Sequence, residues 1–282
     1  MSKFNIRKTA LFYNYYYRLK NIALSVFEWE NLPETCNARF LEDCLFNYGH
    51  AIFVEDEIMS FLNLKVTPSD TLNVYEEPTG FTAFSVDYSK YYSADNCVYI
   101  RNNYLARATD LTTMIFAEKL TRYEMTKDIN VQAQKTPVLI ECDDKTKKSL
   151  EVIYNQYSGD KPVIYANKTL NEKPLNAIST GAPFVADKIR EEKIAVWNEY
   201  LEFLGINTNP SDKKKERLIV SEVNSNNEQI DIQGATMLLC RQKACEEINK
   251  KYNLNVSVKK RIETVDDFKP SLVSGGPVPK HT

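Results

Sequence analysis

Histidine is nearly absent from this sequence, which holds only His50 and His281. Metal sites and general acid–base catalysis commonly use histidine, so a histidine-based catalytic site is not expected. Glycine is also scarce, with eight residues in the chain, and the GxxxxGK[ST] loop that holds a nucleotide's phosphates does not occur. The chain is therefore not expected to be an enzyme that hydrolyses ATP.

Long apolar runs are missing as well. Crossing a bilayer as a helix takes roughly 20 apolar residues, and no run in the sequence approaches that length. A signal peptide needs an apolar core, whereas the N-terminus is basic and then rich in tyrosine. We expect a soluble protein with no membrane partner.

The cysteines do not form a recognisable site. None stands in a CxxC pair, and none has a histidine nearby that could complete a zinc site. Reduced, buried thiols in a cytoplasmic setting are favoured over disulfides. The six are Cys36, Cys44, Cys97, Cys142, Cys240 and Cys245.

The composition that remains is that of a folded protein. Hydrophobic residues make up 43% of the chain, and 36 Lys and Arg nearly balance 38 Asp and Glu. The chain thus lacks the strong overall basicity of a protein that coats nucleic acid. Any contact with DNA must be local.

One acidic cluster has the ingredients of a metal-dependent nuclease. Glu141, Asp143 and Asp144 follow an apolar run and could bind two divalent ions. Three lysines follow within residues 145–148, a pattern typical of a mixed-charge surface loop. We favour the surface loop and expect no cofactor.

The first third of the chain predicts one helix and then a mainly β region. Apolar residues recur at helical spacing over residues 11–29, and Pro33 ends the pattern. Residues 40–104 contain short apolar or alternating stretches, such as 51–54 and 97–100, between turn-forming segments.

Two long helices are predicted around a small insertion. The first runs from Thr109 or Asp110 to about residue 134, roughly 35 to 40 Å at 1.5 Å per residue. The second follows Pro183, and Gly205 closes it. The α/β insertion between them comprises a strand at 137–140, a helix at 150–157 and a strand at 162–166.

The C-terminal part predicts a third helix over 236–251 and a strand over 254–258. Beyond Asp266 the chain is rich in Pro, Gly and Ser and has little with which to form a core, so a disordered tail is expected.

Several short segments, collinear over about residues 27–258, resemble the portal, or upper-collar connector, of small podoviruses of the Picovirinae type. Each segment is weak by itself, but together and in order they are specific. The segments are 27–33 (FEWENLP), 133–140 (AQKTPVLI), 154–157 (YNQY), 162–164 (PVI), 195–199 (AVWNE), 203–206 (FLGI), 214–217 (KKER), 228–230 (EQI), 244–246 (ACE) and Tyr252 with 254–256 (LNV).

The resemblance implies an α+β portal fold with long stem helices, a small α/β clip and a mixed, partly β wing. The two long helices predicted around the insertion agree with that plan. The implied divisions are an N-terminal helix and part of the wing at 1–107, a stem helix at 108–136, the clip at 137–181, a second stem helix at 182–207, a channel loop at 208–225, the rest of the wing at 226–265 and the tail at 266–282.

The same resemblance implies a non-enzymatic subunit of a twelve-membered ring at the capsid vertex. Double-stranded DNA would pass through the ring during packaging and ejection, and the tail would attach to it. The implied partners are a packaging ATPase, the lower collar or tail protein, the major capsid and scaffolding proteins and, in some relatives, a packaging RNA. The implied location is the virion, and the host cytoplasm during assembly.

A ring that holds DNA without reading its sequence needs a few cations that symmetry repeats around the channel. Lys188 matches a channel-facing lysine of the family, whereas the family's second channel lysine falls at Ser179 here. Glu191 and Glu192 would keep the remaining wall repulsive, or pair with Lys188 or Lys193 of a neighbouring subunit. The channel loop contributes Lys213, Lys214, Lys215 and Arg217, for which a solvated charge run is the alternative.

The N-terminal arm combines basic and aromatic side chains, which are the ingredients of a nucleic-acid contact. Lys3, Arg7 and Lys8 are the candidates for contact with a packaging RNA or motor. Because the arm is short, we favour packing against a neighbouring subunit. Trp29 and Trp197, predicted at helical positions, are assigned to core or intersubunit packing.

Two other functions stay open at this point. A generic interaction scaffold would remain monomeric or dimeric and ignore DNA. A metal-dependent DNA-processing enzyme would need an essential carboxylate such as Asp143 or Asp144.

Overall fold

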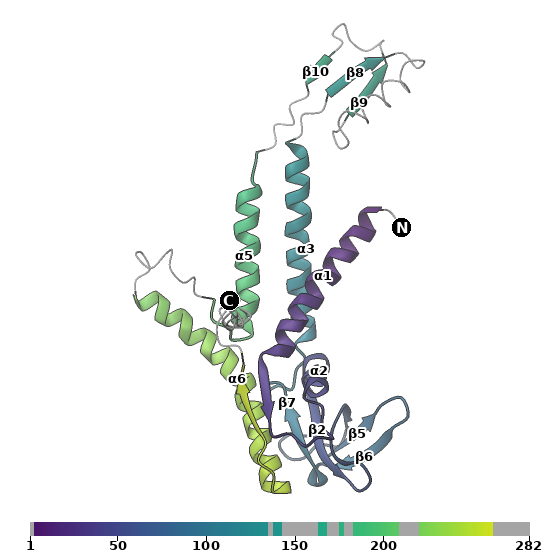
Figure 1. Cartoon of the computed structure of the whole chain (residues 1–282), viewed down its shortest axis with the longest axis vertical. Helices are drawn as coiled ribbons and strands as arrows, with labels where there is room; N and C mark the ends of the chain where they lie inside the picture. The colour runs from purple at the N-terminus through teal and green to yellow at the C-terminus, as the bar shows by residue number, and fades with distance from the viewer. Residues whose placement is uncertain are drawn as a thin grey trace, which may run out of the picture. The chain divides into compact units, whose positions relative to one another are not determined.

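The computed structural model describes residues 3–134, 138–142, 163–167, 175–177, 183–208 and 220–261, and side chains are described outside 3–5, the three short middle segments and 220–233. The chain divides into two compact units, which we treat separately. The first unit comprises residues 1–8 and 119–196, and the second comprises 9–118 and 197–282. Figure 1 labels the elements along the chain.

The second unit contains most of the core, and its N-terminal part alternates helices and strands. Two helices and β1 precede the strands of two small sheets. The elements are α1 (Lys3–Ser25), β1 (Phe27–Glu30), α2 (Ala38–Tyr48), β2 (His50–Asp56), β3 (Ser60–Leu64), β4 (Val66–Pro68), β5 (Gly80–Phe84), β6 (Ser89–Ser93), the 3-10 turn η1 (Ala94–Asn96) and β7 (Cys97–Arg101).

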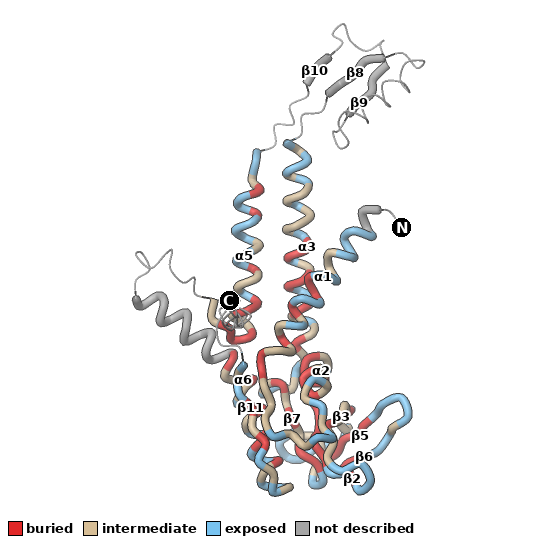
Figure 2. Tube along the Cα trace, viewed as in Figure 1, coloured by how far each residue is buried: buried red, intermediate tan, exposed pale blue. Residues whose placement is uncertain are grey.

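Two antiparallel three-stranded sheets share one core. Their strand orders are β3-β2-β7 and β4-β5-β6. Burial alternates over residues 81–84 of β5, as expected for a strand with one face covered, whereas residues 51–54 of the central strand β2 are all buried. Buried residues occur in α2, β2 and β7 and also in α3, α5 and α6 (Figure 2). The shared cluster consists of Ile52, Val54, Val66, Phe81, Ala83, Tyr92 and Cys97.

Helix α2, which the sequence analysis missed, has a capping residue at each end. The Asn37 side chain accepts a hydrogen bond from the Phe40 amide at 2.9 Å, and Gly49 ends the helix with φ of 82°. A Cβ at Gly49 would lie 2.3 Å from the Ala106 carbonyl oxygen, so the turn also needs glycine for space.

Two of the three later helices have their predicted bounds, and the third begins earlier than predicted. Helix α3 (Asp110–Ala133) and α5 (Ala186–Phe203) match the prediction closely, and Gly205 closes α5 with φ of 75°. Helix α6 (Val220–Tyr252) begins well before the predicted residue 236, so residues 220–225 of the expected channel loop are helical. Its polar first turns carry too few apolar residues to produce a helical pattern in the sequence.

The predicted N-terminal helix is wrong at both ends. Helix α1 begins at Lys3 and ends at Ser25, and Trp29 lies in β1. Strand β1 pairs antiparallel with β11 (Ser257–Lys260), with Trp29 opposite Val258. Because the partner strand lies near the other end of the chain, local periodicity cannot reveal this pairing.

In the first unit, three short strands form one sheet in the order β10-β8-β9. Strand β8 (Val138–Cys142) pairs parallel with β9 (Val163–Asn167) and antiparallel with β10 (Leu175–Ala177). The strands predicted at 137–140 and 162–166 are thus confirmed, whereas β10 was not predicted. The expected helix at 150–157 and the tail beyond 266 lie outside the described residues.

Candidate functional site

The start of α5 carries Lys188, the residue that sequence resemblance assigned to a DNA channel. Two hydrogen bonds to Asn130 of α3 hold the chain just before this helix. The amide of Asn130 donates to the Pro183 carbonyl at 2.9 Å, and the Val185 amide donates to Asn130 Oδ1 at 3.0 Å. Lys188 is exposed, while Ile189 beside it is buried, so the lysine is on the solvent side of α5.

The exposed side of α5 around Lys188 is mainly polar. Glu191, Glu192 and Ala195 are also exposed and follow Lys188 at helical spacings of three, four and seven residues. This face therefore combines one cation with two carboxylates. A surface of this kind suits contact with water and ions better than contact with an apolar partner.

Lys193 lies on the other side of α5 and is engaged within its own chain. Its ammonium group forms an ion pair with Glu124 of α3. The alternative that paired Glu191 or Glu192 with Lys193 of a neighbouring subunit is therefore not needed to satisfy Lys193. The pair joins α3 and α5 inside the first unit.

The basic N-terminal residues differ in their surroundings. Arg7 and Lys8 are both exposed, and Arg7 is ion-paired with Asp128 of α3 at 2.6 Å. The side chain of Lys3 lies outside the described part of the structure. Arg7 is thus already partly neutralised, which weakens it as a contact for nucleic acid.

The tyrosines of α1 separate into two groups. Tyr15 and Tyr16 are buried, and the Tyr16 hydroxyl donates to Asp110 at 2.6 Å. Tyr13 and Tyr17 are exposed and stack on each other with ring centroids 5.9 Å apart. Packing therefore accounts for the first pair.

Arg18 and the two tryptophans have packing roles inside the second unit. The Arg18 guanidinium lies 5.0 Å from the centroid of Trp197. Trp29 donates its indole N–H to Glu42 at 2.7 Å. Both tryptophans are half-buried and contact other side chains of the second unit, and Trp29 does so from a strand instead of the predicted helix.

The channel-loop cations Lys213, Lys214, Lys215 and Arg217 lie outside the described residues. The side chains of the acidic cluster at 141–144 do so too. Among the described residues, no group of three or more His, Cys, Asp and Glu could hold a metal ion. Nothing in the described part of the chain thus favours the metal-dependent enzyme.

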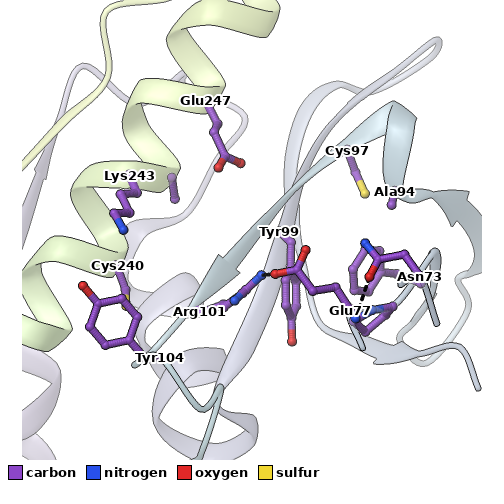
Figure 3. Close-up of a pocket in the computed structure, with 13 residues that line it drawn as sticks. Asn73, Glu77, Ala94, Cys97, Tyr99, Arg101, Tyr104, Cys240, Lys243 and Glu247 are labelled. Atoms are coloured by element: carbon purple, nitrogen blue, oxygen red, sulfur yellow. Dashed lines mark hydrogen bonds and ion pairs between the residues drawn. The ribbon is translucent and has the colours of Figure 1, made fainter. Parts of the chain in front are cut away.

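A cleft of about 380 Å³ opens between α6, β7 and the turn around residue 77 (Figure 3). Arg101 forms an ion pair with Glu77 across it, and Lys243 of α6 lies 5.3 Å from the Tyr104 ring centroid. The hydrogen bond from Arg101 lowers the pKa of Glu77. A carboxylate held ionised in this way is a poor general acid at neutral pH.

The thiols beside that cleft are poor nucleophiles. Burial raises the pKa of Cys97 to about 11, and it raises the pKa of Cys240 as well. Both are free and buried, so they are thiols, not thiolates, at neutral pH. The cleft has the chemistry of a packing or docking surface, not that of a catalytic site.

His50 is likewise structural. Burial lowers its pKa, and its Nε2 lies 3.2 Å from the Val66 carbonyl oxygen. A neutral imidazole held by a backbone carbonyl has no substrate-facing role. His281 lies outside the described residues.

The structure also reveals a buried ion pair that sequence reasoning missed. Arg241 of α6 binds Glu42 of α2, and both side chains are at most 5% exposed. The Asn102 side-chain oxygen accepts a hydrogen bond from Arg241 at 3.1 Å. The local sequence does not indicate that either residue is buried, because charged residues at these positions are also typical of the exposed side of an amphipathic helix.

Comparison with known proteins assigns the chain to a family. The family model described as Phage Connector (GP10) matches residues 1–265. A solved structure described as the portal and tail of native bacteriophage P68 contains a similar chain, with 15% sequence identity and a TM-score of 0.50. The match covers 92% of this chain and 88% of that one, and at this identity it shows the fold alone.

Within the described residues, no helix is long and apolar enough to span a membrane. The mixed helix-and-strand fold is that of a phage portal, as predicted. The family is structural and not catalytic in character. The chain therefore belongs to the Phage Connector (GP10) family and is a portal, or connector, subunit at the capsid vertex of a tailed-phage virion.

Proposed function

We propose that twelve copies of this chain form a closed ring whose channel conducts double-stranded DNA into and out of the capsid. The observation that carries this proposal is the connector-family match over residues 1–265. A closed ring is the assembly that gives every copy the same environment around one DNA axis. The ring also gives the tail a single attachment point.

Lys188 is the residue of the described chain that we assign to DNA contact. Its exposed ammonium group is repeated once per subunit, so the ring presents a circle of isolated cations. Phosphate contacts of this kind hold DNA without reading its sequence. The neighbouring Glu191 and Glu192 limit the attraction, which allows the duplex to slide instead of being gripped.

The basic cluster at 213–217 is assigned a second contact with the duplex. Its lysines and arginine are close together in sequence, and symmetry would multiply them around the channel. Asp212, Glu216 and Glu222 partly offset their charge, so the contact is weaker than the count of cations suggests.

The energy for DNA movement is assigned to a separate packaging ATPase. The sequence lacks a phosphate-binding loop. Beside the cleft, Glu77 is ion-paired and the thiols of Cys97 and Cys240 are buried, so they do not form a nucleophile-and-base pair. The chain itself is assigned no enzymatic activity. The remaining partners we propose are the lower collar or tail protein and the major capsid and scaffolding proteins.

A packaging RNA or the motor is the proposed partner of Lys3, Arg7 and Lys8. Arg7 and Lys8 are both exposed, but the ion pair with Asp128 already offsets the charge of Arg7, so this contact is the weakest of those proposed. The ring would assemble in the host cytoplasm and remain in the virion.

Electron-microscope imaging of the purified chain tests the proposal. Class averages should show a ring with rotational symmetry and an open channel wide enough for duplex DNA. The same preparation should bind unrelated duplexes with similar affinity and lose binding steeply as salt rises. Small particles of one size under several salt conditions would contradict the proposed ring and would favour an interaction scaffold instead.

A further inference from the structure

We infer that the cleft between α6 and β7 holds residues 266–269 of the same chain. This segment (DDFK) lies outside the described part of the structure. The family match ends at residue 265, so the family assigns the segment no place. The inference goes beyond the proposed ring and does not depend on it, because the contact lies within one copy.

The α6 side of the cleft carries two charged residues without opposite charges beside them (Figure 3). Lys243 and Glu247 are both exposed and line the cleft four positions apart. Lys243 lies over the Tyr104 ring, and neither residue forms an ion pair with another described residue. The other two charged residues of the lining, Arg101 and Glu77, pair with each other. The cleft thus presents one cation and one carboxylate that a segment of mixed charge can pair.

Opposite α6, the lining includes small and apolar residues that can pack against an aromatic ring. Among them are Pro78, Ala94 and the half-buried Tyr99, which stacks on Phe81 with ring centroids 4.7 Å apart. A further ring beside such a pair gains from edge and face contacts as well as from burial. Phe268 is the aromatic residue of the segment.

Pro270 favours a backbone conformation that suits a cleft with two unlike walls. The residue before a proline is restricted to extended conformations, so the segment should be extended where it meets Pro270. Side chains of an extended segment alternate between its two sides. Asp266 and Phe268 then point to one wall, while Asp267 and Lys269 point to the other.

The spacing of the charges on the segment matches the spacing of the charges on α6. Asp267 and Lys269 are two extended residues, or about 6.6 Å, apart. The Cβ atoms of helical residues at i and i+4, the spacing of Lys243 and Glu247, are about 5–6 Å apart. Asp267 can therefore pair with Lys243 while Lys269 pairs with Glu247.

The last described residue lies close enough for the segment to reach the cleft. This residue is Arg261, and its amide donates at 2.8 Å to the carbonyl of the residue before Phe27. The Phe27 ring centroid lies 4.1 Å from the guanidinium carbon of Arg241, and Arg241 is next to Cys240 of the cleft lining. Asp267 follows Arg261 by six residues, which span up to about 20 Å when extended.

Tethering allows a weak contact to be sufficient. A short linker within one chain gives an effective concentration in the millimolar range. Exposed ion pairs, such as those proposed at Lys243 and Glu247, contribute little by themselves. Burial of the Phe268 ring therefore supplies most of the attraction, and the charges fix the direction in which the segment lies in the cleft.

Limited digestion of the full chain with chymotrypsin tests the inference, because this protease cleaves after Phe268 and docking shields that bond. Release of residues 269–282 is followed by mass spectrometry. Lys243→Glu replaces an attraction by a repulsion and should speed the release about tenfold. Adding Asp267→Lys to Lys243→Glu restores the pair and should return the release to its slow rate. Arg39→Glu, at an exposed position of α2, should leave the rate unchanged.

A disulfide gives a second readout that does not use proteolysis. Lys243→Cys combined with Asp267→Cys should cross-link within one copy roughly tenfold faster than Arg39→Cys combined with Asp267→Cys. Arg39 is a matched control position because it is exposed and lies three residues before Glu42, which Arg241 contacts. Both positions are therefore near the part of α6 that the segment has to reach.

Release of residues 269–282 from the unchanged chain as fast as from Lys243→Glu would overturn the inference. Equal cross-linking rates for the two cysteine pairs would overturn it as well. Dimers on a non-reducing gel would also contradict it, because they place the segment in the cleft of a neighbouring copy. Folding of each variant is checked by circular dichroism, and neither readout needs a ring, so failure of the proposed ring would leave this test intact.

Discussion

Arg241 and Glu42 are 199 positions apart in the chain and meet through two hydrogen bonds inside the second unit. Arg241 Nε donates to Glu42 Oε1 at 2.9 Å, and its Nη2 donates to Oε2 at 2.7 Å. This two-point geometry joins α6 to α2, and Trp29 adds its hydrogen bond to the same carboxylate. A paired geometry of this kind is the strongest form of ion pair.

Removing the carboxylate should be strongly destabilising. Glu42→Gln leaves the Arg241 charge buried without an opposite charge, and breaking a buried pair from one side costs about 3–5 kcal/mol. The urea midpoint should fall accordingly at a fixed protein concentration. Tryptophan fluorescence is a suitable probe, because Trp29 contacts Glu42 directly.

Glu77→Gln is the matched control for that variant. It breaks the ion pair between Glu77 and Arg101, whose side chains are 45% and 34% exposed. Ion pairs this exposed contribute about 1 kcal/mol or less to stability. Equal losses for the two variants would contradict the buried-pair account.

The contact between Gly205 and Gly234 should reverse the usual effect of a helical Gly→Ala change. Alanine normally stabilises a helix interior by about 1 kcal/mol relative to glycine. A Cβ at Gly234, however, would lie 2.8 Å from the Cα of Gly205, so backbone atoms would have to move. We expect Gly234→Ala to lower the melting temperature.

Glu246→Ala on the exposed side of α6 is the control, since it changes helix propensity without a close contact. The melting temperature of that variant should stay within about 2 °C of the unchanged chain. If the Gly234→Ala variant melts at a higher temperature, the backbones at Gly205 and Gly234 can move apart at little cost in free energy.

Asp56 should make the second unit sensitive to acid. A hydrogen bond from Lys90, followed by bonds from the backbone amides of Ile58 and Met59, holds the pKa of this carboxyl well below its usual range. Its stabilising contribution is therefore present above the unfolded pKa of about 3.9 and is lost as pH falls through the lower folded value.

Thermal melts of Asp56→Asn between pH 7 and pH 2 test this dependence. The variant should melt lower than the unchanged chain at pH 7, and the difference should shrink below about pH 4. Asp87→Asn, in the exposed β5–β6 turn, should show no such convergence. A constant difference at all pH values for Asp56→Asn would assign the effect to packing.

Lys188→Ala should weaken DNA binding through electrostatics alone. Each lost phosphate contact lowers the slope of log affinity against log salt by about 0.9. Binding to a short duplex is measured at several salt concentrations, with ring assembly checked in parallel. The slope should decrease while rings form normally.

Arg190→Ala is the paired control for Lys188→Ala. Arg190 is also exposed on α5 but lies two residues, or about 200° of helix rotation, away from Lys188. Its removal should leave the salt slope unchanged. Equal effects of the two substitutions would indicate a general charge effect instead of a directed contact.

The sequence by itself was sufficient for features that depend on local pattern. The extents of α3 and α5 follow from apolar spacing, and Gly205 takes the left-handed conformation that its place after α5 predicts. The strands near residues 51–54 and 97–100 follow from short apolar runs and from the turns that bound them. Ordered matches along the chain also led to the portal family, which the family model supports.

Only the tertiary structure decided what depends on distant partners. Trp29 belongs to a strand because β11 pairs with β1, and Arg241 is buried because Glu42 and Asn102 meet it from other elements. The same dependence separates Lys193, paired with Glu124, from Lys188 on the exposed side of one helix. Local spacing encodes which residues share a face, but the identity of the surface that meets that face is a property of the folded chain.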